Sequence, residues 1–96
     1  GSLVAAAPAR ATLPAPYYLR MALADRPGAL AKVAAVLGEA GVSIDRMRQT
    51  RHEASEAPVL IVTHPTTRAS LDSALSGMEG TGVVLAPPVA LRIEQV

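Results

Sequence analysis

The chain has 96 residues, half of them apolar, and its 9 basic and 8 acidic residues leave a formal net charge of +1. This balance argues against an electrostatic surface for nucleic acid or for an anionic membrane. Because the sequence contains no Cys, Phe or Trp, it excludes disulfides, thiol catalysis and cysteine-based zinc sites, and the core must be largely aliphatic.

The N-terminal residues are not typical of a folded domain. Gly1-Ser2 without an initiating Met resembles a cloning scar, so we expect the chain to be a piece of a longer protein. Residues 3–16 are rich in Ala and Pro and predict an interdomain linker, which leaves residues 17–94 as one small domain. No apolar run approaches the roughly 20 residues that span a bilayer, and with the lack of Cys this favours a cytoplasmic protein.

The next segment alternates and then changes to a helical period. Residues 17–24 place apolar side chains at every second position, which predicts a half-buried strand. Residues 28–40 predict a helix with one apolar stripe, and Gly41 is expected to end it in a left-handed conformation. The residues expected to face inward are Tyr17, Leu19, Met21 and Leu23 in the strand, and Leu30, Val33, Ala34 and Leu37 in the helix.

Two further strands follow, with a polar turn between them. Residues 42–52 predict the second strand, and because its apolar residues change parity, we expect a bulge between Ile44 and Met47. Residues 53–57 form the polar turn. Residues 58–64 are the most apolar strand of the chain, which suits a central place in a sheet.

The last part of the chain predicts a helix and an edge strand. Thr66 or Thr67 is a suitable N-cap for the helix, and the glycine-rich turn at residues 80–82 ends it. Residues 83–93 predict a strand in which a Pro-Pro pair removes ladder donors and therefore suits an edge or a bend. The expected apolar stripe of the helix is Leu71, Ala74, Leu75 and Met78, and the expected inner face of the strand is Val89, Leu91 and Ile93.

The resulting order, βαββαβ, indicates an α+β fold. The connection rules fold this order into a ferredoxin-like sandwich with a four-stranded antiparallel sheet and both helices on one face. The other face must be solvated or covered: Ser43, Asp45 and Arg92 at candidate outer positions indicate solvent, whereas Leu60 and Val62 indicate a covering partner. We therefore expect a homodimer or a docked catalytic domain of the same chain.

The run DRPGAL at residues 25–30 predicts a helix N-terminus that can hold an anion. Pro27 suits the first helical position, and Gly28 lets a ligand approach bare backbone. Unpaired N–H groups and the helix dipole favour a carboxylate or phosphate, while Asp25 could cap the helix or hold an ammonium group. Together these features describe a site for a free amino acid. The alternative is an ordinary helix start without a ligand.

Other kinds of chemistry find little support in the sequence. No nucleophile with a base or carboxylate pair stands at a usable spacing, and no third ligand is implied beside His52 and His64. Neither nucleotide-binding glycine motif is present. RNA-binding modules of this element order stack bases on aromatic residues of the central strands, where we expect none, so Arg46, Arg48 and Arg51 indicate a solvated strand face. We expect no metal, nucleic acid or membrane partner.

The pattern resembles the ACT domain, a small regulatory module of this element order that binds amino acids. The resemblance is carried by ADRPGAL at residues 24–30 and GVSID at residues 41–45. More narrowly, YYLR at residues 17–20, APVLIVTH at residues 57–64 and PVALRIE at residues 88–94 resemble the C-terminal regulatory segment of bacterial homoserine dehydrogenases. The similarity covers nearly the whole expected domain.

The resemblance implies a regulatory domain, not itself an enzyme, of an NAD(P)-dependent enzyme that reduces aspartate semialdehyde to homoserine on the route to threonine and methionine. Catalysis and the NAD(P) cofactor would belong to a catalytic domain outside this chain, and no cofactor is expected here. The domain would sense L-threonine for feedback control. The carboxylate of the effector would take N–H groups near Gly28, Ala29 and Leu30. Its ammonium group and side chain would face Asp25, Ser43 and Ile44.

Ser43 departs from this resemblance, because many amino-acid-binding members have Asn there, which offers both a donor and an acceptor. Its hydroxyl could reach a ligand, and a solvent-facing strand serine is an equally good interpretation. Since some ACT domains bind nothing and only assemble subunits, a non-binding assembly module is the alternative function. A stand-alone ACT regulator with no attached enzyme is a third.

Overall fold

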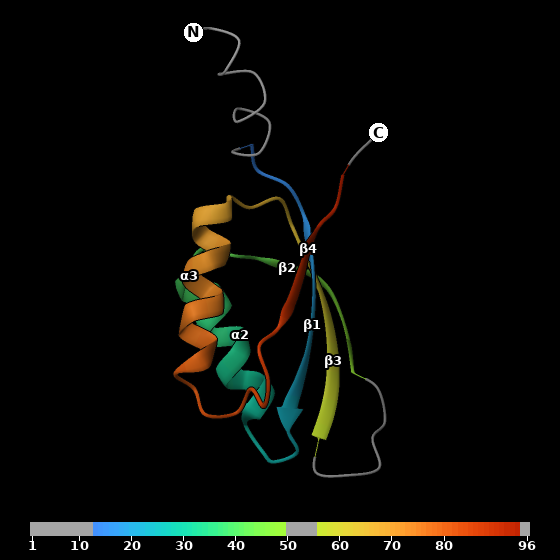
Figure 1. Ribbon diagram of the computed structural model, residues 1–96, viewed down its shortest axis with the longest axis vertical. Coiled ribbons are helices and arrows are strands. Elements are labelled where there is room, and N and C mark those ends of the chain that lie inside the picture. The colour runs from blue at the N-terminus through green and yellow to red at the C-terminus, as the bar shows by residue number, and fades with distance from the viewer. Residues whose placement is uncertain (1–12, 50–55, 95–96) are drawn as a thin grey trace, which may run out of the picture.

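The computed structural model describes residues 13–49 and 56–94. The elements are β1 (Tyr17–Ala24), α2 (Ala29–Glu39), β2 (Ile44–Gln49), β3 (Glu56–Thr63), α3 (Arg68–Glu79) and β4 (Val89–Arg92). The four strands form one antiparallel sheet of order β2-β3-β1-β4, and both helices cover the same face of it (Figure 1). This arrangement confirms the expected ferredoxin-like α+β sandwich. Arg51, His52 and most of the expected polar turn lie outside the described residues.

The core lies between the sheet and the two helices. β1 alternates as predicted, with Tyr17, Leu19, Met21 and Leu23 buried. β3 lies at the centre of the sheet, also as predicted. The helices contribute Ala29, Val33 and Leu37 from α2 and Leu71, Ala74 and Met78 from α3. Neither described helix has the length and apolar character needed to cross a bilayer.

The face of the sheet away from the helices carries an aromatic residue, contrary to the prediction from the sequence. Tyr18 lies half-exposed on β1, directly opposite Val62 of β3. Since β1 is the second central strand of the sheet, the expectation that the central strands carry no aromatic side chain is wrong.

The C-terminal end of α2 follows the predicted pattern. Gly41 has φ +81°, its N–H donates to the Gly38 carbonyl at 3.0 Å, and the Val42 N–H donates to the Leu37 carbonyl at 2.8 Å. These two bonds form a Schellman motif, which satisfies carbonyls that the helix leaves unpaired. Ala34 was expected to face inward and is exposed, because the buried residues of α2 recur at every fourth position and this one lies beside their stripe.

β2 is shorter than the predicted strand at residues 42–52, and its irregularity is where we expected it. The pairing with β3 shifts register between Ile44 and Arg46, which confirms a bulge in this part of the strand. The extra residue is Asp45, which is exposed.

β4 is an edge strand, as expected, but it begins only after the Pro-Pro pair and is therefore shorter than the predicted strand at residues 83–93. The predicted inner face is wrong, because Val89 and Leu91 are 40% and 56% exposed and Ile93 follows the end of the strand. The register places Ala90 opposite Leu19, so Ala90 takes the position that packs against the core. The prolines interrupt the predicted strand, and the pairing with β1 then determines which of its residues face the core.

Thr67 caps α3, since its Oγ1 accepts a hydrogen bond from the Ser70 N–H at 3.1 Å. This confirms one of the two predicted caps. Near its C-terminal end, α3 approaches α2 closely, because a Cβ at Gly77 would lie 2.9 Å from Cγ1 of Val36. Val36 is β-branched and has little rotamer freedom with which to give way.

We therefore expect Gly77→Ala to lower the free energy of unfolding by about 1 kcal/mol, because overpacking costs about 1–3 kcal/mol and better helix propensity returns up to about 1 kcal/mol. Gly38→Ala is the matched control. A Cβ at Gly38 meets nothing within 4 Å, so this variant should gain about 0.5–1 kcal/mol. Urea unfolding of both variants measures the difference, and equal stabilisation by both would contradict a close helix contact.

Candidate functional site

The turn between β1 and α2 contains two of the predicted site residues, Asp25 and Gly28, and the first turn of α2 contains two more, Ala29 and Leu30. Asp25 and Gly28 are exposed. Gly28 has φ +84° and is the N-cap of α2, so the helix begins at Ala29. The prediction that Pro27 is the first helical residue is wrong, because a left-handed Gly28 cannot continue a right-handed helix. Pro27 instead lies in the turn before it.

The start of α2 presents backbone donors with little competition from side chains. Among the described residues no side chain caps the helix, and its first turn holds no acidic residue. The Ala29 N–H donates a hydrogen bond to the Arg26 carbonyl at 3.3 Å. Further along the helix, the Lys32 N–H donates to the Gly28 carbonyl at 3.0 Å. The two N–H groups between them, of Leu30 and Ala31, therefore face the region where the helix dipole favours an anion.

Individual residues of the turn contribute differently from what was expected. The Ala29 side chain is 5% exposed and belongs to the core, and its N–H is already bonded within the turn. Leu30 is half-buried against the core. Within α2, the backbone donors suited to an anion therefore begin with the Leu30 N–H, and the predicted contribution of the Ala29 N–H is taken by the turn.

Ser43 and Ile44 lie at the other end of the sheet. β1 and β2 both pair antiparallel with β3, so they run in the same direction and start at the same end of the sheet, with β3 between them. Along β3, Glu56 stands opposite Ala24 and Thr63 opposite Ile44. Seven residue steps of about 3.3 Å separate these points by about 23 Å. One chain therefore does not bring the six predicted residues together.

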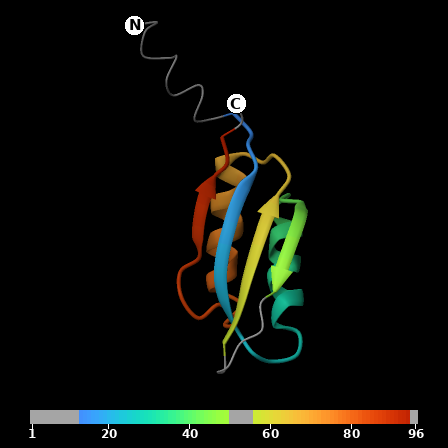
Figure 2. The same ribbon diagram turned by 90° about the vertical axis from the view of Figure 1, so that its right-hand side faces the viewer.

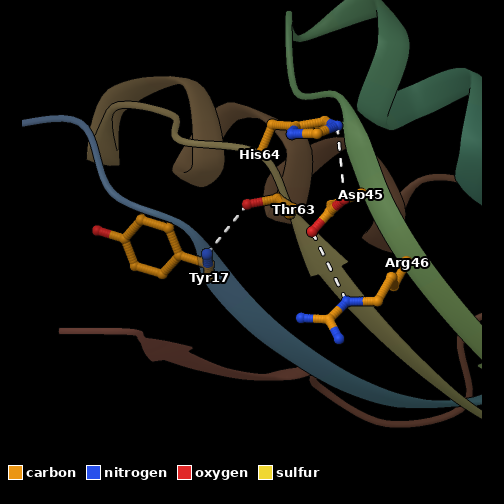
Figure 3. A network of polar contacts seen from close by, with 5 residues as sticks. All are labelled: Tyr17, Asp45, Arg46, Thr63 and His64. Atoms are coloured by element: carbon orange, nitrogen blue, oxygen red, sulfur yellow. Dashed lines mark hydrogen bonds and ion pairs between the residues drawn. The ribbon is translucent and has the colours of Figure 1, made fainter. Parts of the chain in front are cut away.

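Polar contacts surround the start of β2 (Figure 3). The Asp45 carboxylate lies 3.7 Å from both His64 Nε2 and Arg46 Nε. The backbone carbonyl of Ser43 accepts a hydrogen bond from the His64 N–H at 2.9 Å. Asp45 and His64 were not among the predicted site residues, and the signal that would have indicated them is the bulge, since an extra residue re-aims its side chain.

Beside them, Thr63 ties two strands together. Its buried Oγ1 accepts a hydrogen bond from the Tyr17 N–H at 3.0 Å, as Figure 3 shows. The preceding residues are held to the same end, because Ala15 and Thr66 exchange two backbone hydrogen bonds of 3.0 and 2.9 Å. The start of β2 thus lies at an end of the sheet where hydrogen bonds hold neighbouring segments together.

Arg92 holds the segment before β1. Its register position opposite Tyr17 puts it on the helix side of the sheet, so its expected outer position is wrong. Its guanidinium donates to Glu94 at 2.7 Å and to the Leu13 carbonyl at 3.2 Å. The hydrogen bond to Glu94 raises the pKa of Arg92 above its ordinary value. A hollow of about 310 Å³ lies between these residues and Pro65.

Among residues 13–49 and 56–94, no group of three or more His, Asp or Glu side chains could hold a metal ion. The described residues therefore offer an anion-binding helix start at one end and a polar, bulged strand start at the other. Neither end contains a nucleophile with a base.

Known proteins are similar to this chain in both sequence and fold. The family model described as the ACT domain matches residues 17–78. The homoserine dehydrogenase of Pseudomonas aeruginosa is 35% identical over 82 residues, which are 83% of this chain and 19% of that protein. The chain spans about a fifth of the length of such curated relatives, namely 19% and 20% for the first two.

Solved structures agree with the sequence comparison. A homoserine dehydrogenase from Thiobacillus denitrificans superposes with a TM-score of 0.76 at 29% identity, over 86% of this chain and 18% of that one. The ligand-free regulatory subunit of aspartate kinase from Thermus thermophilus superposes with a TM-score of 0.59 at 19% identity, over 86% of this chain and 56% of that one, which shows a likeness of fold alone.

Proposed function

The chain belongs to the ACT domain family, and we propose that it is the amino-acid-sensing regulatory domain of a homoserine dehydrogenase, with L-threonine as its effector. The observation that carries this proposal is the start of α2, where backbone N–H groups and an exposed Asp25 flank one turn. Main-chain donors at a helix N-terminus suit a carboxylate, and a carboxylate side chain suits an ammonium group.

We propose that the complete site forms between two copies of the chain. Ser43 and Ile44 stand about 23 Å from the turn of their own chain, by seven strand steps. A twofold axis makes each contact of a symmetric dimer occur twice. One arrangement of such a dimer sets the α2 start of each copy against the β2 start of its partner. The effector carboxylate then takes the Leu30 N–H, and its side chain faces Ser43 and Ile44 of the partner.

The whole protein is proposed to be an NAD(P)-dependent enzyme that reduces aspartate semialdehyde to homoserine. The curated relatives, which carry the name homoserine dehydrogenase, support this. We propose that the cofactor and the reacting groups lie in the remaining length of the whole protein, since this chain spans only 19% and 20% of those two relatives. Effector binding that favours one dimer arrangement would change catalytic-domain affinities by about 5- to 150-fold, because allosteric coupling amounts to about 1–3 kcal/mol.

A non-binding assembly module is the second candidate. It is favoured by the separation of the predicted site residues within one chain, since the domain then has a structural role even where no effector completes the site. In that case the dimer forms through the same surfaces, and the start of α2 is an ordinary helix start that binds no ligand.

A thermal-shift screen of the 96-residue chain against the twenty amino acids separates the two candidates. A ligand at one hundred times its Kd stabilises the folded state by about 2.7 kcal/mol, which raises Tm by roughly 10 °C in a domain of this size. We expect this shift with L-threonine and none with D-threonine, which has the same composition. A folded, dimeric chain whose Tm responds to no amino acid would support the assembly module.

A further inference from the structure

The outer face of the sheet carries two parallel rows of side chains. The strand registers align one residue from each strand in each row. One row holds Arg46, Val62, Tyr18 and Leu91, and the other holds Arg48, Leu60, Arg20 and Val89. We call these eight residues the outer face.

Nothing in the described part of the chain covers the outer face. Figure 2 views the sheet with both helices behind it, so that this side faces the viewer. Leu91 is 56% exposed and Val89 is 40% exposed, while Tyr18, Leu60 and Val62 are half-buried. Neighbouring apolar side chains on β3, β1 and β4 form a continuous patch, of the kind that marks an interaction site.

The charge on the outer face has one sign. Arg20, Arg46 and Arg48 are exposed, and the eight positions include no acidic residue. At the edge of the face, the Asp45 carboxylate lies 3.7 Å from Arg46 Nε. The outer face is therefore apolar along β3 and β4, with guanidinium groups on β1 and β2.

A shallow hollow lies where these two kinds of side chain meet. It has a volume of about 380 Å³ and is lined by Tyr18, Arg46, Met47, Arg48, Leu60 and Val62. An apolar side chain entering it would contact Leu60 and Val62, with arginines on the β2 side. Guanidinium groups bind carboxylates through paired hydrogen bonds.

We propose that the outer face docks an acidic amphipathic protein segment, one with apolar side chains flanked by Asp or Glu. A second copy fits less well, because each of two stacked outer faces would bring three arginines and no carboxylate to the interface, and like charges disfavour association. Single-stranded RNA also fits less well, because the face offers Tyr18 as its single aromatic side chain, whereas modules of this topology stack two or three bases. This inference is independent of the proposed function.

Fluorescence anisotropy with defined probes tests the proposal on the full chain. The probe is a labelled two-heptad helical peptide with Leu on one face and Glu elsewhere. We expect it to bind, and we expect a peptide with Ser in place of each Leu, and a U-rich RNA oligonucleotide, to bind at least tenfold more weakly. Complementary charge acts mainly on association, so binding should also weaken as salt is raised.

Paired variants locate the binding surface. Arg20→Glu with Arg48→Glu should weaken peptide binding by at least tenfold, whereas Lys32→Glu, an exposed site on α2, should leave it unchanged. Leu91→Ser should weaken binding, whereas Leu85→Ser, 48% exposed in the loop before β4, should not. The proposal would be overturned by any one of three results. These are no binding of the peptide, tighter binding of the RNA than of the peptide, or self-association in sedimentation that Leu91→Ser abolishes.

Discussion

Replacing Leu19 with alanine is expected to destabilise the domain by about 3–5 kcal/mol, a large share of the roughly 5–15 kcal/mol by which folded domains are stable. Leu19 has no exposed surface and lies on β1 between Ile61 of β3 and Ala90 of β4. The truncation would leave a cavity at the centre of a core that has no Phe or Trp with which to fill it. Urea unfolding followed by circular dichroism measures the loss.

Leu91→Ala is the matched control for this prediction. Leu91 lies on the neighbouring strand, faces away from the helices and is 56% exposed, so its truncation should change the free energy of unfolding by about 0.5 kcal/mol or less. Similar losses for Leu19→Ala and Leu91→Ala would mean that the outer face is buried in the protein as it exists in solution.

Replacing Asp25 with alanine should weaken L-threonine binding by roughly 10- to 150-fold, because a hydrogen bond to a charged group contributes about 1.5–3 kcal/mol. Asp25 is exposed in the turn before α2. Glu39→Ala, which removes an exposed carboxylate at the other end of the same helix, should leave the affinity unchanged. Isothermal titration calorimetry of both variants compares the two effects, and equal affinities would remove Asp25 from the site.

Gly28 is a less informative position for this test. Its φ of +84° strains any side chain, although a Cβ there would meet no atom within 4 Å. A loss of binding in Gly28→Ala would therefore mix backbone strain with the loss of a ligand contact. Asp25 separates binding from folding more cleanly.

The sequence predicted the elements where one pattern dominates. β1 alternates strictly because it packs under both helices, and the capping Thr67 and the left-handed Gly41 act through local chemistry. β4 was assigned the wrong face because Leu91 is the more apolar residue, whereas its pairing with β1 puts small Ala90 against the core. Tertiary pairing overrode hydropathy there.

The candidate site was only partly predictable for a different reason. The residues around Gly28 form a local turn, so their neighbourhood followed from the sequence. The distance from that turn to Ser43 depends on strand direction. In a βαββαβ sheet the first and third elements run in parallel, so the start of the helix and the start of the second strand lie at opposite ends. This consequence of topology does not appear in any local motif.

Mixing two variants that each bind the effector weakly tests most directly whether the effector site is built from two copies of the chain. Asp25→Ala removes one half of the proposed site, and Ser43→Val removes the other. After subunit exchange in an equal mixture, half of the dimers pair different variants, and each of these regains one intact site, so calorimetry should recover about a quarter of the wild-type L-threonine sites at wild-type affinity. A mixture that binds no better than its two components would contradict the shared site.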